Sequence, residues 1–195
     1  MPLNHTSKFS ELTNRQFEVI GRLVVEWSNI EFLLGVLLSR LLFTPEFLGR
    51  VYTDKLTASR LQSGLRKALQ IHMHRYQHRV LAENDAQEIV ALNSEIERIR
   101  GKRNKFSHFC WCRSNDEEIF GSGLSGFVPP AKELKKDSMV VSVQELEELY
   151  KQSYSLVDRL SAVVARIPAI DEERNLISAF SRPPSPPLRS SESGG

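Results

Sequence analysis

Arg103, Asn104 and His108 are the residues of this sequence whose types and spacing have the clearest potential for chemistry. A guanidinium is a permanent cation that clamps a phosphate through two parallel hydrogen bonds. An imidazole exchanges protons near neutral pH. A displacement reaction at a phosphate needs a base for the attacking group, an acid for the leaving group and positive charge at the phosphate. The segment therefore contains groups suited to such a reaction.

The arginine of this segment occupies a position where its helix calls for an apolar residue. Apolar side chains recur at spacings of three and four, and the same register then continues through the motif: Ile89, Leu92, Ile96, Ile99, Arg103 and Phe106. A buried guanidinium without a partner costs several kcal/mol, so Arg103 requires a carboxylate or a phosphate.

Glu31 breaks the pattern of the first helix in the same way. The expected core stripe of that helix alternates four and three apart, and Glu31 is its only charged member: Ile20, Val24, Trp27, Glu31, Leu34, Leu38 and Leu41. Opposite charges on two core stripes predict a buried or interfacial pair between Glu31 and Arg103. A purely structural interpretation remains open, in which this pair only holds the helices and His108 caps a helix C-terminus.

The Arg-Asn-x3-His pattern at the end of an apolar helix resembles the signature of the HEPN superfamily, and only Arg103, Asn104 and His108 match at the level of a motif. The resemblance covers roughly residues 12–167. It implies a mainly all-α fold, a four-helix up-down bundle. The small β-hairpin insertion that the sequence predicts after the third long helix departs from the simplest form of that layout. It also implies a metal-independent endoribonuclease without cofactors, in which two protomers of a homodimer bring their motifs together.

The resemblance further implies the role of each residue. Arg103 would hold phosphate, His108 would transfer the proton or orient the 2'-hydroxyl, Asn104 would orient both, and Glu31 would position Arg103. The expected setting is a toxin or antiphage defence system, with RNA as substrate and an antitoxin or regulatory protein as a further partner. The alternative is a non-catalytic dimeric module of the same type that binds a protein partner or RNA.

Composition sets broad limits on these hypotheses. The chain has 195 residues, of which 41% are hydrophobic, and this suits one globular domain with a core. A net charge of +2 requires that any RNA contact come from a local patch. The second long helix offers such a patch, with four possible RNA-binding residues: Arg66, Lys67, Arg75 and Arg79.

Metal binding is disfavoured by the sequence. His74 and His78 share a helix face, and with His72 they lie among Arg and Lys residues that repel a divalent cation. This face is expected to be solvated or to contact RNA phosphate. Cys110 and Cys112 do not form a zinc pattern, and we expect reduced, buried thiols in a cytoplasmic protein.

The apolar segment at residues 32–43 is too short and too charged for a membrane span, so we expect no membrane partner. Helices are predicted from Ser10 or Thr13 to Thr44, from about Thr53 to Leu81, from Asn84 to the motif, and from Ser142 to Pro168. A short helical turn is expected near Phe47 to Val51.

Short strands are predicted at residues 109–113, 118–121 and 139–141, with a Gly- and Pro-rich loop over 121–130. Ser142 and Glu145 form a capping box for the last helix. Residues 1–168 are expected to form one domain, and residues 169–195, rich in Pro and Ser, a disordered tail.

Overall fold

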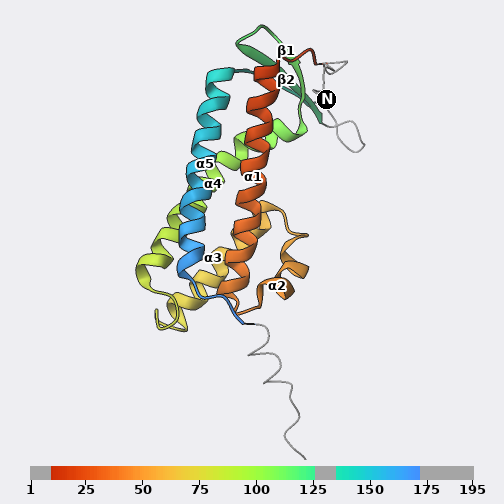
Figure 1. Cartoon of the computed structure of the whole chain (residues 1–195). Coiled ribbons are helices and arrows are strands. Elements are labelled where there is room, and N and C mark those ends of the chain that lie inside the picture. Colours follow the sequence, from red (N-terminus) through yellow and green to blue (C-terminus); the bar gives the residue numbers. More distant parts are fainter. Residues whose placement is uncertain (1–9, 126–134, 172–195) are drawn as a thin grey trace, which may run out of the picture.

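The computed structural model describes residues 10–125 and 135–171 of the chain. This part is mostly helical and contains a small three-stranded antiparallel sheet (Figure 1). The helices are α1 (Asn14–Leu41), α2 (Glu46–Thr53), α3 (Ala58–His74), α4 (Glu83–His108) and α5 (Val143–Arg166). The strands are β1 (Cys110–Arg113), β2 (Glu118–Ser125) and β3 (Lys135–Ser142).

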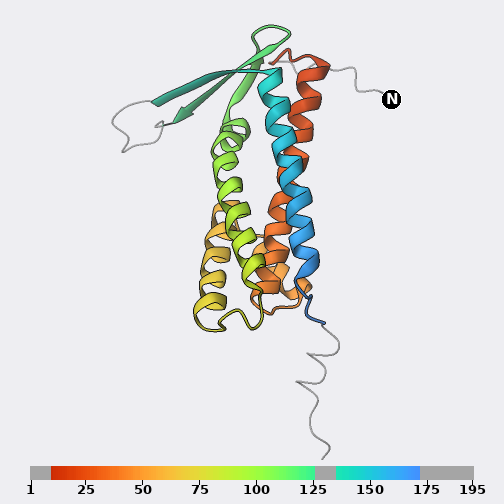
Figure 2. The same ribbon diagram turned by 90° about the vertical axis from the view of Figure 1, so that its left-hand side faces the viewer.

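Three of the helices run the full height of the molecule, and α3 reaches only about half of it (Figure 2). α1 packs most extensively against α5, which runs parallel to it: Arg15 at the start of α1 pairs with Glu147 at the start of α5. The half that contains α3, here the closed half, has a core of Leu and Ile side chains, among them Leu34, Leu65 and Leu92. The other half, which we call the open half, lacks α3. There the sheet packs against α1, α4 and α5.

α1 begins with a capping box in which Thr13 and Gln16 bond to each other's backbone N–H groups. The core stripe predicted for α1 is correct from Trp27 onward but wrong at Val24, which is 52% exposed. Leu23 and Val19 are buried there instead. Apolar residues on both sides of the stripe made the two registers indistinguishable by spacing alone.

α2 lies on α1 through small side chains, and it confirms the short helical turn expected there. A Cβ added at Gly49 would come within 2.2 Å of the Ser39 Oγ, and one added at Gly35 within 3.2 Å of the Thr53 Oγ1. Glycine at these positions therefore permits the close approach of the two helices.

α3 begins after the cap Thr57 and ends at His74, so the prediction of a helix continuing to Leu81 is wrong. The chain turns instead, with positive φ angles of 48° and 59° at Gln77 and His78. The expectation of a solvated histidine face is also wrong at His72, which is 2% exposed with its Nε2 2.8 Å from the Leu41 carbonyl oxygen.

The sheet has the order β1-β2-β3 and follows directly from the end of α4. The strands predicted at residues 118–121 and 139–141 were too short: β2 continues past Gly121 to Ser125, and β3 begins at Lys135. The loop predicted over 121–130 is therefore strand in its first part, and residues 126–134 lie outside the described residues. Alternation of Gly and Ser in β2 hid the strand from a pattern based on apolar residues.

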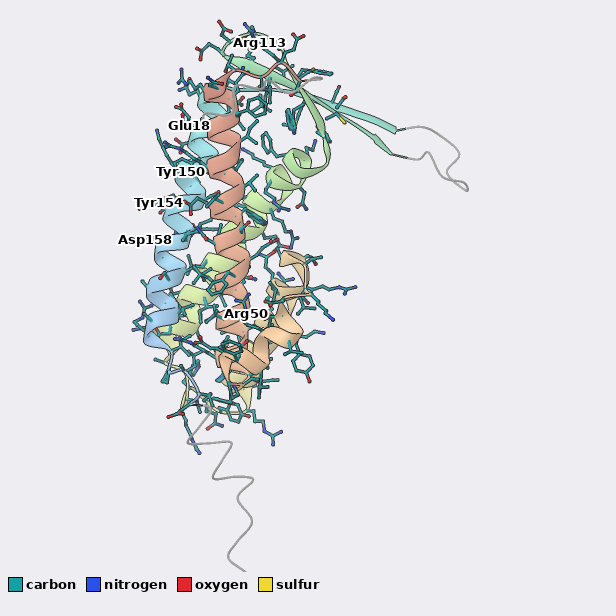
Figure 3. The ribbon with its side chains drawn as sticks, turned by 45° about the vertical axis from the view of Figure 1, so that its right-hand side comes forward. Glu18, Arg50, Arg113, Tyr150, Tyr154 and Asp158 are labelled. Atoms are coloured by element: carbon teal, nitrogen blue, oxygen red, sulfur yellow. The ribbon has the colours of Figure 1, made fainter. Side chains whose placement is uncertain are left out.

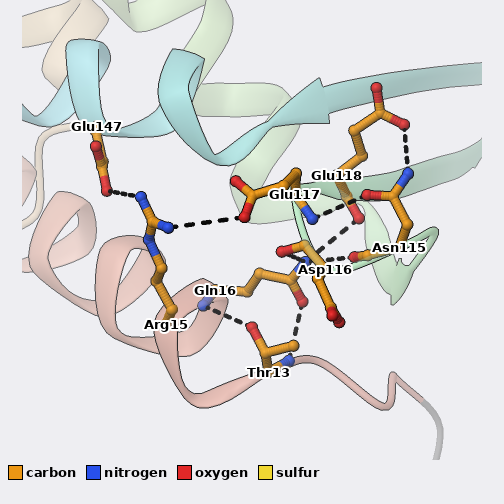
Figure 4. Close-up of polar contacts among 8 residues, drawn as sticks. All are labelled: Thr13, Arg15, Gln16, Asn115, Asp116, Glu117, Glu118 and Glu147. Atoms are coloured by element: carbon orange, nitrogen blue, oxygen red, sulfur yellow. Dashed lines mark hydrogen bonds and ion pairs between the residues drawn. The ribbon is translucent and has the colours of Figure 1, made fainter.

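The turn between β1 and β2 is anchored on the start of α1 (Figure 4). The Gln16 side-chain N–H groups donate to the carbonyl oxygens of Asn115, Asp116 and Glu118, the shortest at 2.8 Å. Arg15 adds contacts to Glu117 and to Glu147 of α5. The sheet is thus fixed to the start of α1 by the buried Gln16, and the exposed ion pairs of Arg15 add a link to the start of α5.

α5 begins at the predicted capping box, in which the Ser142 Oγ accepts from the Glu145 backbone N–H at 3.1 Å. It ends at Arg166, as the following proline predicts. Most of the expected tail, residues 172–195, lies outside the described residues. Among the described residues, none of the helices combines the length and apolar character that a bilayer crossing requires.

Candidate functional site

Arg103 lies in the open half of the molecule and faces α1 from α4. Its guanidinium carbon is 5.2 Å from the centre of the Trp27 ring, and Trp27 is fully buried. The side chain of Arg103 is half-buried, so the cation–π contact is partly desolvated, where such contacts are strongest. A core position of α4 is therefore filled by a cation that rests on an aromatic surface.

Glu31 contacts the same tryptophan at its edge. The Trp27 Nε1–H donates to the Glu31 Oε1 at 2.9 Å. The two ionisable members of the core stripes thus meet on one indole, with Glu31 at its N–H and Arg103 over its ring. A direct pair between Glu31 and Arg103 stays a prediction. The connection through Trp27 was not predicted, because the sequence interpretation treated this residue only as core.

Asn104 is exposed and lies one helical turn before position 108 on the same face of α4. The backbone of His108 forms the last residue of α4, and its side chain lies outside the described part of the structure. α3 starts near the level of Arg100, whose guanidinium bonds to Gln62 of α3. The end of α4 therefore projects past α3 and is not covered by it (Figure 2).

An aromatic group fixes the direction in which the chain leaves α4. The Phe106 and Trp111 rings stack at 4.9 Å between centres, with 14° between their planes. The Trp111 Nε1–H also donates to the Phe106 carbonyl oxygen at 2.9 Å. Gly121 of β2 leaves room for this indole, because an added Cβ would lie 2.5 Å from the ring. The last turn of α4 is thereby held rigidly against the sheet.

A cleft of about 360 Å³ adjoins Glu31 between α1 and α2. Its charged lining consists of Glu31, Arg50 and Asp54. Arg50 pairs with Asp54 at 2.8 Å, and its guanidinium lies 4.5 Å from the Phe32 ring centre. The carboxylate of Glu31 is therefore accessible from outside, although Trp27 behind it is not.

A second and larger groove, of about 630 Å³, lies between α4 and α5. Four cations line it, namely Arg98, Lys102, Lys151 and Arg159. Arg159 pairs with Glu95 through two hydrogen bonds of 2.7 and 3.1 Å, and this contact lowers the pKa of Glu95 below its ordinary value. The sequence interpretation missed this groove, although Arg98 and Lys102 are four apart on one helix face.

The four residues predicted to bind RNA lie elsewhere. Arg66 pairs with Glu97 at 3.2 Å, and Lys67 is exposed beside it. Arg75 and Arg79 are exposed in the connection before α4, roughly 30 Å from Arg103 by the rise of an α-helix. The structure therefore does not bring Arg75 and Arg79 together with the motif, whereas the α4–α5 groove adjoins the helix that carries it.

The remaining candidates are the two cysteines and the possible metal ligands. Cys110 is exposed, so the expectation that it is buried is wrong, and the half-buried Cys112 Sγ is 3.6 Å from the Phe120 carbonyl oxygen. Within residues 10–125 and 135–171, no group of three or more His, Cys, Asp or Glu side chains is arranged to hold a metal ion.

Comparison of the chain with protein-family models, with curated proteins and with solved structures finds no match.

Proposed function

We propose that the chain is a metal-independent endoribonuclease that cleaves RNA through its 2'-hydroxyl at a site made by two copies of the chain. The observation that carries the proposal is the setting of Arg103, a half-buried cation on the fully buried Trp27. A guanidinium packed on an aromatic ring loses little freedom when it binds phosphate, so it is preorganised for such a ligand.

In this reaction the 2'-oxygen attacks phosphorus and the bond from phosphorus to the 5'-oxygen breaks. One proton leaves the 2'-hydroxyl and another reaches the 5'-oxygen. Arg103 would hold the non-bridging phosphate oxygens, and His108 would transfer a proton or orient the 2'-hydroxyl. Asn104, exposed one turn before His108, would orient the reacting groups. Because each chain has one such Arg and one such His, a second copy would complete the acid and the base.

The charge distribution of α4 supports a polyanionic substrate. From residue 98 to the end of the helix the chain has five basic residues and no acidic one: Arg98, Arg100, Lys102, Arg103 and Lys105. Cations at a helix C-terminus also favour the helix dipole, but two of these line the α4–α5 groove and contribute phosphate affinity there. In a toxin or antiphage defence setting, an antitoxin or regulatory protein would restrain the activity.

The test is cleavage of tRNA and single-stranded RNA in EDTA by the wild type, Arg103→Ala and His108→Ala, each checked for folding by circular dichroism. We expect the wild type to produce 2',3'-cyclic phosphate and 5'-hydroxyl ends, and both variants to lose this activity. Arg113→Ala and His74→Ala are matched controls, because both residues are exposed and lie outside the motif. Undiminished cutting by His108→Ala contradicts the proposal.

The alternative, a non-catalytic dimeric module that binds RNA or a protein, gives a different result in the same experiment. RNA would then bind without being cut, and Arg103→Ala would weaken binding while leaving the RNA intact in every sample. The observation that favours this alternative is the large apolar surface of α2, which suits a protein partner.

A further inference from the structure

α2 buries its small residues and exposes its large apolar ones, which is the reverse of an ordinary surface helix. Its buried residues are the small Gly49 and Thr53, which face α1. Its large apolar side chains point away from the molecule: Phe47 is 81% exposed, Tyr52 74%, Val51 66% and Leu48 46%. Surface helices of globular proteins place apolar residues toward the core, so this arrangement needs another explanation.

The outer face of α1 continues the apolar surface. Phe17, Val24, Val25 and Phe32 are 40–57% exposed and lie on one side of the helix with the small Gly21 and Ser28. Figure 3 shows α1 and α2 next to each other on the side that also presents Arg50. Together the eight large apolar residues of α1 and α2 form what we call the α1–α2 face.

We propose that the α1–α2 face binds a second copy of this chain. The eight side chains expose on the order of 800 Å² of apolar surface, which is the area that each partner contributes to a typical stable interface. Isolated monomers rarely expose an apolar patch above a few hundred Å². The face is also long and lies on rigid helices, as a self-complementary two-fold contact requires.

The charges around the α1–α2 face argue against a polyanionic partner such as RNA or an anionic membrane. Arg50 pairs with Asp54 on α2, and Arg40 pairs with Glu46. On α1, Arg22 pairs with Glu18. These three arginines are each balanced by an anion, so they leave no excess positive charge to attract RNA or an anionic lipid surface.

The position of the face also determines what a dimer would bring together. Glu31 lies on α1 at the border of the face with the buried Trp27 behind it, and the cleft beside Glu31 opens between α1 and α2. A two-fold contact through this face would place the two Trp27–Arg103 pairs near the same interface. This last step depends on the proposed function, whereas the self-association is argued from the surface alone.

The test is sedimentation velocity of the full chain from about 1 to about 100 µM, a range that spans the affinities of weak and moderate interfaces. We expect a dimer for the wild type. Val51→Glu and Val24→Glu should each raise the dissociation constant roughly 30-fold or more, as loss of a central interface residue does. Val90→Glu is the matched control, because Val90 is a helical valine that is 48% exposed on α4.

Several results would overturn the inference. A wild type that stays monomeric at the highest concentration, or a Val51→Glu variant that dimerises like Val90→Glu, contradicts it. Flotation of the wild type but not of Val51→Glu with anionic vesicles would assign the face to a lipid surface instead. RNA cleavage measured on the same samples separates the two proposals: a dimer without cleavage contradicts only the function, and cleavage by a monomer contradicts only the shared site.

Discussion

The closed and open halves of the molecule share α1, α4 and α5 but are held together by different means. In the closed half, α3 completes the core, and Leu65 and Leu92 are fully buried. In the open half α3 is missing, and an arginine on a tryptophan, stacked rings and a polar anchor at Gln16 accompany a smaller apolar cluster at the sheet. We therefore expect the closed half to provide most of the stability, and in the proposed function the open half would present the reacting groups.

This contrast predicts the largest loss of stability for a truncation in the closed half. Leu92→Ala removes a fully buried side chain and leaves a cavity, so we expect the free energy of unfolding to fall by about 2–5 kcal/mol. Denaturant unfolding followed by circular dichroism measures the change. Val90→Ala, on the exposed side of the same helix, should change stability by less than about 0.5 kcal/mol. Equal effects of the two variants would contradict the assignment of the core.

The aromatic group of the open half should respond to overpacking. In Gly121→Ala the new Cβ would lie 2.5 Å from the Trp111 ring, which has to move away from Phe106. We expect a loss of about 1–3 kcal/mol and a changed tryptophan fluorescence spectrum. Gly101→Ala is the control, because an added Cβ there meets nothing within 4 Å and should be neutral or stabilising. An unchanged spectrum in Gly121→Ala would refute this packing.

The cap that joins the sheet to α5 should contribute less. Ser142→Ala removes the hydroxyl that accepts from the Glu145 backbone N–H, and we expect a loss of about 1 kcal/mol at pH 7.

The same cap has a pH dependence of known sign. The backbone N–H and hydroxyl of Ser142 lower the pKa of Glu145, so the ionised carboxylate stabilises the folded state above the unfolded pKa of about 4.3. This contribution is lost as the pH falls through the lowered folded pKa. The difference between wild type and Ser142→Ala, measured by thermal unfolding, should therefore narrow in acid. A difference that widens below pH 4 would contradict the assigned contact.

The smallest effect on stability is expected at Arg103 itself. Arg103→Met replaces a half-buried cation on Trp27 with an unbranched apolar side chain, and we expect the free energy of unfolding to change by less than about 1 kcal/mol. RNA cleavage should nevertheless be lost. A large loss of stability would instead indicate that Arg103 is a structural residue. The proposed division between a stabilising closed half and a functional open half would then be contradicted.

Sequence reasoning recovered the elements whose signals are local. The Ser142–Glu145 capping box, the short turn that became α2 and the strand after the motif all follow from neighbouring residues. It failed where two registers were equally apolar, as at Val24, and where a helix ended without a proline, as at His74. Tertiary packing decided both cases.

The candidate site was predictable only in part. The spacing of apolar residues identified Arg103 and Glu31 as exceptions on two core stripes, and the structure places both against Trp27. The α4–α5 groove was not predicted, because Lys151 and Lys102 are brought together only by helix packing. Arg75 and Arg79 were predicted to bind RNA because of their charge, but the length of α4 separates them from the motif.

The extensive pairing of α1 with α5 has a consequence for the newly made chain. Roughly 100 residues separate the end of α1 from the start of α5, and their synthesis takes on the order of 5–20 s. Throughout that time the surface of α1 that α5 later covers has no native neighbour. We therefore expect the nascent chain to depend on chaperones more than helical proteins whose neighbouring helices pair in sequence order.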